Sequence, residues 1–404
     1  MFLGKQEGAE SNPFTSSIAI HACASMADLT AGRQIHCAAV KSGHEISLPV
    51  ANALVDMYCR CSCLSEATQY FRQMPHLDLI TWNTIIAGLD RSGSHDAFHL
   101  LLEMCSRSIQ PNCFTFTSII SACARLALLN CGQQVHAAIT RRGFAQNQQV
   151  ANALVNMYTK CGSIVDSIRI FDEMSQRDIV SYTSMMIGYG LNGNGKDAIK
   201  LFEEMIAVGI QPDSVVFIGL LSACSHAGFI DEGLKYFDLM RTEYSVQPDK
   251  EVYGCVVDLL GRGGRVEEAY GLIQTMPFEA DESIWGALLG ACKVHGNVEL
   301  GRLAAERMLG LRPEGGAKTY IMLSNMYAAE EEWGEAREMR RLMRGSGGRK
   351  EAGRSWVEVR EEVCSFIAGD RGGSPCVGLA HEVLGMLAHH IDGRFHLVDM
   401  EILT

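Results

Sequence analysis

The sequence lacks an excess of positive charge. Its 404 residues include 35 Lys and Arg against 47 Asp and Glu, which gives a net charge of −12. Non-specific nucleic-acid binding depends on many positive charges near the phosphates, so this composition argues against a purely electrostatic binder. It does not exclude a protein that recognises the bases of a single strand.

Long apolar runs and aromatic residues are also scarce. No apolar run approaches the roughly 18 residues that a membrane-spanning helix needs, so we expect no membrane association. Aromatic residues make up only 7 % of the chain. A large core can still form when helices pack through Leu, Ile, Ala and Met, and a chain of this length could be two or three domains or one solenoid.

Motifs for metal or nucleotide binding fail in their context. Cys59, Cys61 and Cys63 have no second pair of ligands at zinc-site spacing. Most of the 15 cysteines are instead interpreted as reduced core residues, because several recur in one frame. The glycine-rich segment 188–197 lacks the preceding strand that a phosphate-binding loop requires, so we interpret Gly188, Gly190 and Gly193 as a turn between helices. We therefore predict no metal, no cofactor and no catalytic residue.

What the sequence does contain is a long internal copy. VANALVNMYTKCGSIVDSIRIFDEM at 150–174 matches VANALVDMYCRCSCLSEATQYFRQM at 50–74, and the similarity continues on both sides. Self-similarity at a fixed offset is typical of repeat proteins. Within 148–178, apolar residues at helical spacing occupy 150–158, Gly162 and Ser163 interrupt them, and a second apolar stripe follows at 164–174. Each unit is therefore predicted to be a helical hairpin that must stack on its neighbours.

The same punctuation divides the rest of the chain. After a short lead at 1–12, we predict repeats at 13–47, 48–78, 79–112, 113–147, 148–178, 179–213, 214–249 and 250–281. Two further hairpins are predicted within 282–349, at 282–315 and 316–349, followed by a tail at 350–404. In the tail, 355–370 has the alternation of a strand or hairpin and 377–390 that of an amphipathic helix. The basic segment 337–354 is interpreted as a solvated helix end, with an RNA or partner contact as the alternative.

The repeats resemble a known family. IVSYTSMMIGYGLNGNGKDAIKLFEEMIAVGIQPD at 179–213 is similar to the full-length motif of plant pentatricopeptide repeats of the PLS class. Residues 152–178 resemble the short motif of that class and 114–147 its long motif. Residues 252–301 are similar to its final repeats passing into E motifs, and 355–370 to the segment that follows. The Trp-x-x-Leu-Gly-x-x-Tyr pattern of tetratricopeptide repeats is absent.

The resemblance implies an all-α fold, a right-handed superhelical solenoid of stacked helix-turn-helix repeats. It also implies sequence-specific binding of single-stranded RNA in a mitochondrion or chloroplast, as a specificity factor for C-to-U editing. RNA binding for splicing or stability, and a protein-interaction solenoid without RNA, are the alternatives. The segment 1–12 does not look like a transit peptide, so we expect either a cytosolic protein or a chain without its true start.

The resemblance further implies partners in editing. A zinc deaminase of the DYW type needs an H-x-E and a C-x-x-C motif, and the sequence contains neither. We therefore expect no enzymatic activity in this chain, a DYW-type deaminase acting in trans, and multiple organellar RNA editing factors as further partners.

In this family the fifth and the last residue of each repeat select one base. A carboxylate can accept the ring N–H of uracil or guanine, an Asn amide suits adenine or cytosine, and Thr at the fifth position leaves room for a purine. The resemblance predicts these pairs: Asn52 with Asp78 for U, Asn83 with Asn112 for a pyrimidine, Thr117 with Asn147 for A, Asn152 with Asp178 for U, and Thr183 with Asp213 for G.

Other positions complete this prediction. Ile80 and Val180, the second residues of their repeats, are expected to flank bases by apolar contact. The pairs of the remaining repeats are uninformative, and the expected RNA sequence is U-Y-A-U-G with the first repeat at its 5′ end. For any single pair, the alternative is that Asn, Thr or Asp merely caps a helix.

Overall fold

The structure, a computed structural model, describes residues 12–94, 96–311, 316–345, 354–359 and 362–367. Two compact units divide the chain, Met1–His295 and Gly296–Thr404. The boundary falls inside the predicted hairpin 282–315, so the two helices of that hairpin belong to different units.

The first unit is a series of helical hairpins. Within its described residues, one 3₁₀ turn, η1 (His44–Ile46), accompanies 17 α-helices. These are α1 (Pro13–Met26), α2 (Leu29–Lys41), α3 (Leu48–Arg60), α4 (Leu64–Gln73), α5 (Leu79–Arg91), α6 (Asp96–Ser106), α7 (Cys113–Leu126), α8 (Leu129–Arg141), α9 (Gln148–Lys160), α10 (Ile164–Glu173), α11 (Ile179–Leu191), α12 (Gly195–Ala207), α13 (Ser214–Ala227), α14 (Ile230–Thr242), α15 (Lys250–Arg262), α16 (Val266–Thr275) and α17 (Glu282–His295).

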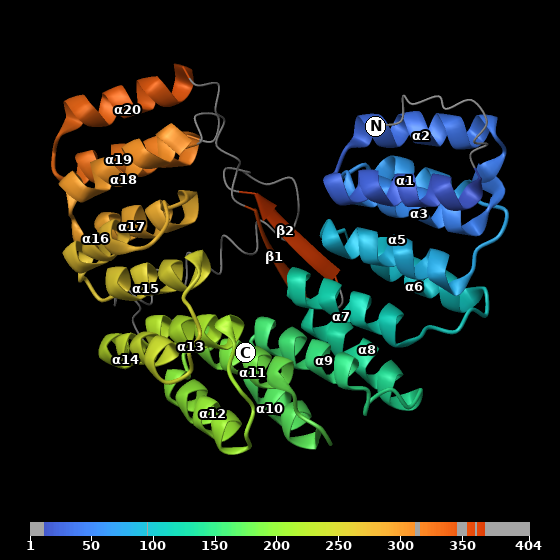
Figure 1. The fold of residues 1–404 in the computed structure, drawn as a ribbon, viewed down its shortest axis with the longest axis horizontal. Helices are drawn as coiled ribbons and strands as arrows, with labels where there is room; N and C mark the ends of the chain where they lie inside the picture. The colour runs from blue at the N-terminus through green and yellow to red at the C-terminus, as the bar shows by residue number, and fades with distance from the viewer. Residues whose placement is uncertain (1–11, 95, 312–315, 346–353, 360–361, 368–404) are drawn as a thin grey trace, which may run out of the picture. The chain divides into compact units, whose positions relative to one another are not determined.

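The helices of this unit form two layers (Figure 1). Each odd-numbered helix contacts the next odd-numbered one, from α1·α3 through α15·α17. Each even-numbered helix contacts the first helix of its own hairpin and the first helix of the next. The odd-numbered layer therefore carries one helix from every repeat, side by side in chain order.

The last residue of a repeat determines where the next odd-numbered helix begins. Asp78, Asn112, Asn147, Asp178 and Asp213 are the N-caps of α5, α7, α9, α11 and α13, and the Oδ1 of each accepts the backbone N–H three residues later. A side-chain oxygen at this position stabilises a helix by satisfying a backbone N–H that has no partner within the helix.

The layers are held together by apolar side chains and by close approaches at glycine. Trp82, Phe71 and Phe116 are among the largest fully buried side chains. Gly188 and Gly190 lie inside α11, so the interpretation of both as turn residues was wrong; only Gly193, with φ 76°, lies in the turn. A Cβ at Gly190 would stand 2.8 Å from Cα of Ala223, so glycine is required there for α11 and α13 to approach.

The second unit contains three described helices and a β-hairpin. The helices are α18 (Val298–Leu311), α19 (Ala317–Ala329) and α20 (Trp333–Gly345), and they contact one another in chain order. Strands β1 (Arg354–Val359) and β2 (Glu362–Ile367) pair antiparallel, which confirms the strand pattern predicted in this region. The helix predicted at 377–390 lies outside the described residues.

Some basic side chains of α20 already have partners within the second unit. Arg341 pairs with Glu338 at 2.7 Å, and the Nε of Arg340 donates to the Oγ of Ser324 at 2.9 Å. This agrees with the interpretation of the basic segment as a helix end, although Arg340 also has a structural contact. Across the helices that the structure describes, none is long and apolar enough to cross a membrane.

Candidate nucleic-acid interface

The odd-numbered layer places the fifth residue of a repeat beside the last residue of the same repeat. The last residue caps the next odd-numbered helix, and that helix lies against the one that carries the fifth residue. Residues about 30 positions apart therefore meet at the N-terminal ends of neighbouring helices. This arrangement recurs along the layer.

The pair Asn152 and Asp178 forms a closed hydrogen-bond network. The Nδ2 of Asn152 donates to the Oδ1 of Asp178 at 3.3 Å. The same Oδ1 accepts the backbone N–H of Ser181 at 2.9 Å, as a helix cap. The other carboxylate oxygen, Oδ2, has no hydrogen bond within the part of the chain that the structure describes. Capping and base recognition are therefore compatible, because they would use different oxygens.

The pair Asn83 and Asn112 has the same arrangement. The Nδ2 of Asn83 donates to the Oδ1 of Asn112 at 3.2 Å, and that oxygen also accepts the N–H of Thr115 at 3.1 Å. The Oδ1 of Asn112 is therefore directed towards the helix, which leaves its Nδ2 as a donor on the other side. A donor at this place suits the ring nitrogen of cytosine.

The pair Asn52 and Asp78 lies in a groove between α1, α3, α5 and α7. The groove has a volume of about 730 Å³ and is lined by five predicted residues, Asn52, Asp78, Ile80, Asn83 and Thr117. The Oδ1 of Asp78 accepts both the N–H and the hydroxyl of Thr81, at 2.8 and 2.7 Å. The Oδ1 of Asn52 is buried and has no hydrogen-bond partner among the residues that the structure describes.

Both carboxylates of these pairs are held ionised. Burial alone would raise the pKa of Asp178, but hydrogen bonds from Ser181 and Asn152 outweigh it and lower the pKa below its usual value. The pKa of Asp78 is lowered in the same way, with burial opposed by hydrogen bonds from Thr81 and Asn52. At neutral pH both side chains are acceptors only, which suits a ring N–H of uracil.

In each of the two threonine pairs, the two members are not hydrogen-bonded to one another. The hydroxyls of Thr117 and Thr183 donate to carbonyls of their own helices, Cys113 and Ile179, at 2.8 and 2.7 Å. Their partners Asn147 and Asp213 cap the following helices. The structure thus places these residues in register, with no hydrogen bond joining the two members of a pair.

Apolar side chains project from the second positions of the repeats. Ile80 and Val180 are 63 % and 51 % exposed. The same position is also apolar and exposed at Phe14, Phe114 and Val215, which were not predicted as site residues. The register of Ile80 and Val180 was sufficient to find them. Exposed apolar residues at this spacing can make apolar contacts with the faces of bases, and Phe14 and Phe114 offer aromatic rings on which a base can stack.

Cations on the odd-numbered helices were also missed. Arg91 lines the groove described above, and it pairs with Asp56 at 3.1 Å. Arg125 of α7 pairs in the same way with Asp90 of α5, at 3.2 Å. Both are the thirteenth residue of their repeat, as is Lys160, which has no ion pair within the described residues. These positions could neutralise phosphates of a strand bound along the layer.

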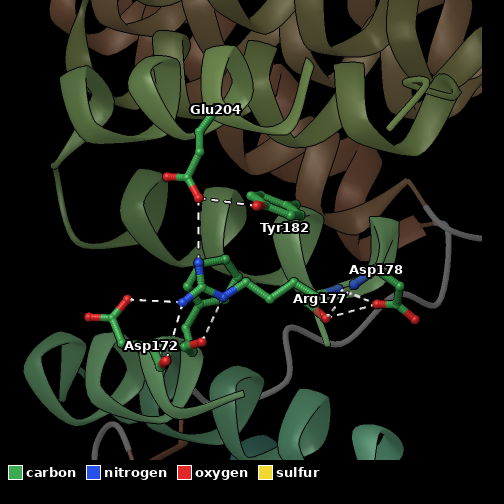
Figure 2. A network of polar contacts seen from close by, with 7 residues as sticks. Asp172, Arg177, Asp178, Tyr182 and Glu204 are labelled. Atoms are coloured by element: carbon green, nitrogen blue, oxygen red, sulfur yellow. Dashed lines mark hydrogen bonds and ion pairs between the residues drawn. The ribbon is translucent and has the colours of Figure 1, made fainter. Parts of the chain in front are cut away.

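Arg177 fixes the loop that ends at Asp178. Its guanidinium donates to the carbonyl of Phe171 at 3.0 Å, pairs with Glu204 at 3.4 Å and lies 4.4 Å from the ring centroid of Phe171. Figure 2 shows Arg177 between Asp172 and Glu204, with Tyr182 donating to Glu204 from the other side. A clamped loop holds Asp178 in place at the start of α11.

The remaining chemistry-bearing residues are structural. Both carboxylate oxygens of Asp249 are used, one by the N–H of Val252 and one by the hydroxyl of Ser214 at 2.6 Å. Cys23, Cys123, Cys224 and Cys292 are buried, and burial raises the pKa of the Cys224 thiol to about 12. No group of three or more possible metal ligands occurs among the residues that the structure describes.

Comparison with known proteins gives the family. The model of the PPR repeat matches 50–79, 150–179, 215–244 and 251–278, that of the PPR repeat family matches 77–125 and 177–226, and the E motif matches 295–358. The pentatricopeptide repeat-containing protein At1g56570 of Arabidopsis thaliana is 50 % identical over 400 residues, which cover 98 % of this chain and 65 % of that protein. The chain belongs to the pentatricopeptide repeat proteins, in the PLS class with an E motif.

Other relatives carry organellar names. The chloroplastic protein CRR2 of Arabidopsis thaliana is 37 % identical over 96 % of this chain and 60 % of its own length. The mitochondrial protein At2g03880 of the same plant is 37 % identical over 98 % of this chain and 63 % of its own length. The chain thus spans less than two thirds of the length of these relatives.

A solved structure supports the fold. The crystal structure of the pentatricopeptide repeat protein PPR10 in complex with an 18-nt psaJ RNA element has a TM-score of 0.63. The two sequences are 21 % identical, and the match covers 85 % of this chain and 52 % of the PPR10 chain. The predicted all-α solenoid of stacked helical hairpins is therefore confirmed, with the β-hairpin of the second unit as an addition.

Proposed function

We propose that this protein binds single-stranded RNA sequence-specifically in an organelle and acts as a specificity factor for C-to-U editing, with a deaminase of the DYW type recruited in trans. The arrangement of Asn152 and Asp178 is the main observation in favour. An ionised carboxylate oxygen and an amide N–H lie side by side, which complements the ring N–H and carbonyl of uracil.

Several observations support RNA as the ligand. Three in-register Asn pairs lie along one layer of helices, and exposed apolar side chains stand at the second position of five repeats. PPR10, whose fold is similar, was solved with an 18-nt RNA element. The relatives named chloroplastic or mitochondrial support an organellar location in one of these two compartments.

The experiment is binding of this chain to short RNAs. We expect an oligonucleotide with U-Y-A-U-G to bind at least tenfold more tightly than one with the same bases in scrambled order, because mismatched bases leave buried polar groups unpaired. The measurement is fluorescence anisotropy at two salt concentrations. Equal affinity for both RNAs would contradict the proposal and favour a protein-interaction solenoid, a role with which the net charge of −12 agrees.

The editing role is tested separately. In a plant that lacks the protein, a cytidine a short distance downstream of the U-Y-A-U-G site is expected to stay unedited in chloroplast or mitochondrial transcripts. Normal editing combined with lost splicing or unstable transcripts would contradict the editing role and leave the RNA-binding role standing.

A further inference from the structure

The fifth residue of a repeat is correlated with the third residue of the next repeat. Where the fifth residue is Asn, the third residue of the next repeat carries a hydroxyl: Thr81 follows Asn52, Thr115 follows Asn83, and Ser181 follows Asn152. In the other five repeats the third residue of the next repeat is Val or Ile, at Val50, Val150, Val216, Val252 and Ile284. All eight repeats follow this rule.

The hydroxyls lie beneath the fifth and last residues of the repeat, the pair that is proposed to face the RNA. Thr81, Thr115 and Ser181 are fully buried. The Oγ of Ser181 lies 2.8 Å from the Oδ1 of Asn152, and the Oγ1 of Thr115 lies 2.6 Å from the Oδ1 of Asn83. The hydroxyls of Ser181 and Thr115 therefore reach across from one helix to the amide of the preceding odd-numbered helix. Each also lies next to the Oδ1 of the last residue of the repeat.

Two contacts together determine which way the amide of Asn152 points. The ionised Asp178 can only accept hydrogen bonds, so the Asn152 atom beside it must be the donor, Nδ2. The Oδ1 of Asn152 must then point inwards, where it needs a donor of its own because a buried acceptor without one is destabilising. The Ser181 hydroxyl supplies that donor. The second N–H of the amide is left to face the bound strand.

We infer that the hydroxyl residue at the third position of the following repeat, Thr115 or Ser181, is a positioning residue for base selection. It fixes the Asn amide with its donor towards the RNA, and this inference rests on the proposed function. Without the hydroxyl, the inward-facing Oδ1 of the amide loses its donor and the amide is held only by the last residue of the repeat. The amide is then less firmly oriented, so that the repeat loses part of its preference for a base carbonyl at that place. Selection would then depend on three residues, one of which never touches RNA.

The threonine repeats show why the hydroxyl is absent elsewhere. The hydroxyl of Thr183 is already paired with the carbonyl of Ile179, so it needs no partner from the next helix. Val216, the third residue of the next repeat, is fully buried. A hydroxyl there would have no amide to hold and would itself require a partner.

At the pair Asn52 and Asp78, the same arrangement is incomplete. The Oγ1 of Thr81 donates to Asp78 but has no hydrogen bond to Asn52, whose Oδ1 is left buried and unpaired. The repeats 48–78 and 148–178 thus share their base-selecting pair but differ in how firmly the amide is held. We expect the base at repeat 48–78 to be selected less strictly.

The first test removes the hydroxyl from Ser181. Affinities are measured for RNAs that carry U, C, A or G opposite repeat 148–178, with the whole chain. Ser181→Ala is expected to lower the preference for U over A by about fivefold, the contribution of one buried hydrogen bond. Ser181→Thr is expected to restore it, since Thr stands at the matching position in two other repeats. The preference for G opposite repeat 179–213 is the internal control and should not change.

The second test introduces the Asn amide and its buried hydroxyl at repeat 179–213, which has neither. Thr183→Asn alone should give repeat 179–213 only a weak preference for U over G. Thr183→Asn combined with Val216→Thr should raise that preference by a further factor of about five. Val216→Thr alone should leave the preference for G unchanged, which makes it the matched control for the added hydroxyl.

The outcomes separate the inference from the function on which it rests. If the unaltered chain shows no base preference at repeat 148–178, the proposed function fails. If it prefers U and Ser181→Ala keeps the full preference, or if Val216→Thr adds nothing to Thr183→Asn, the positioning role is overturned while RNA recognition stands. If Ser181→Ala only destabilises the protein, it would weaken binding to all four RNAs alike and leave the ratio of affinities for U and A unchanged. That result would also contradict the positioning role.

Discussion

Asp178→Asn is expected to change the preference of repeat 148–178 from U towards C. The substitution replaces an acceptor at Oδ2 with an amide that can donate, so the ring N–H of uracil loses its partner and the ring nitrogen of cytosine gains one. Hydrogen bonds to charged groups contribute about 1.5–3 kcal/mol, so the affinity for the U-containing RNA should fall roughly 10- to 100-fold. The helix cap survives, because Asn112 caps α7 in the same way.

Two controls accompany this prediction. Asp249→Asn changes a carboxylate whose two oxygens are already used within the protein, so it should leave base preference unaltered. The pKa of Asp178 is lowered, so its carboxylate stays ionised in mild acid and the preference for U should be the same from pH 8 down to about pH 5. An unchanged U-to-C ratio in Asp178→Asn would contradict the pairing of Asp178 with uracil.

Trp82→Ala is expected to be the most destabilising of the substitutions considered. Trp82 is fully buried, its ring lies edge-on to Phe71 at 4.9 Å between centroids, and Arg107 lies over it at 5.6 Å. Removing a buried aromatic side chain of this size lowers the free energy of unfolding by about 3–5 kcal/mol, through lost contacts and the cavity left behind. Urea unfolding followed by circular dichroism measures this.

Trp82→Phe should have a much smaller effect. The Nε1 of Trp82 is buried and has no hydrogen-bond partner in the described part of the chain, so removing this donor offsets part of the lost volume. The net change should be within about 1 kcal/mol. The matching residue in the second copy, Tyr182, donates to Glu204 at 3.1 Å, so Tyr182→Phe removes a satisfied hydrogen bond and should be destabilising by about 1 kcal/mol. A loss in Trp82→Phe as large as in Trp82→Ala would show that the indole nitrogen is not an uncompensated donor.

The sequence by itself determined the arrangement of helices to a large extent. Apolar residues at helical spacing fix where each hairpin buries its faces, and Asp or Asn at the end of a repeat provides a cap for the next helix, so both the period and the starts of the odd-numbered helices are local properties. The internal copy at 50–74 and 150–174 made this pattern visible because both segments obey the same constraints. The strand pattern after 354 was local as well.

The tertiary structure decided what the pattern left open. The glycine-rich segment after a predicted helix led to the prediction of Gly188 and Gly190 as turn residues, but they lie in α11, where the absence of a side chain lets neighbouring helices approach. The sequence did not single out Thr115 or Ser181, because the proposed role of their hydroxyls depends on contacts between different helices. A repeat sequence encodes its own helices through short-range spacing. Which oxygen of Asp178 caps the helix and which stays free depends on atoms brought together from two repeats, and only three-dimensional packing specifies that.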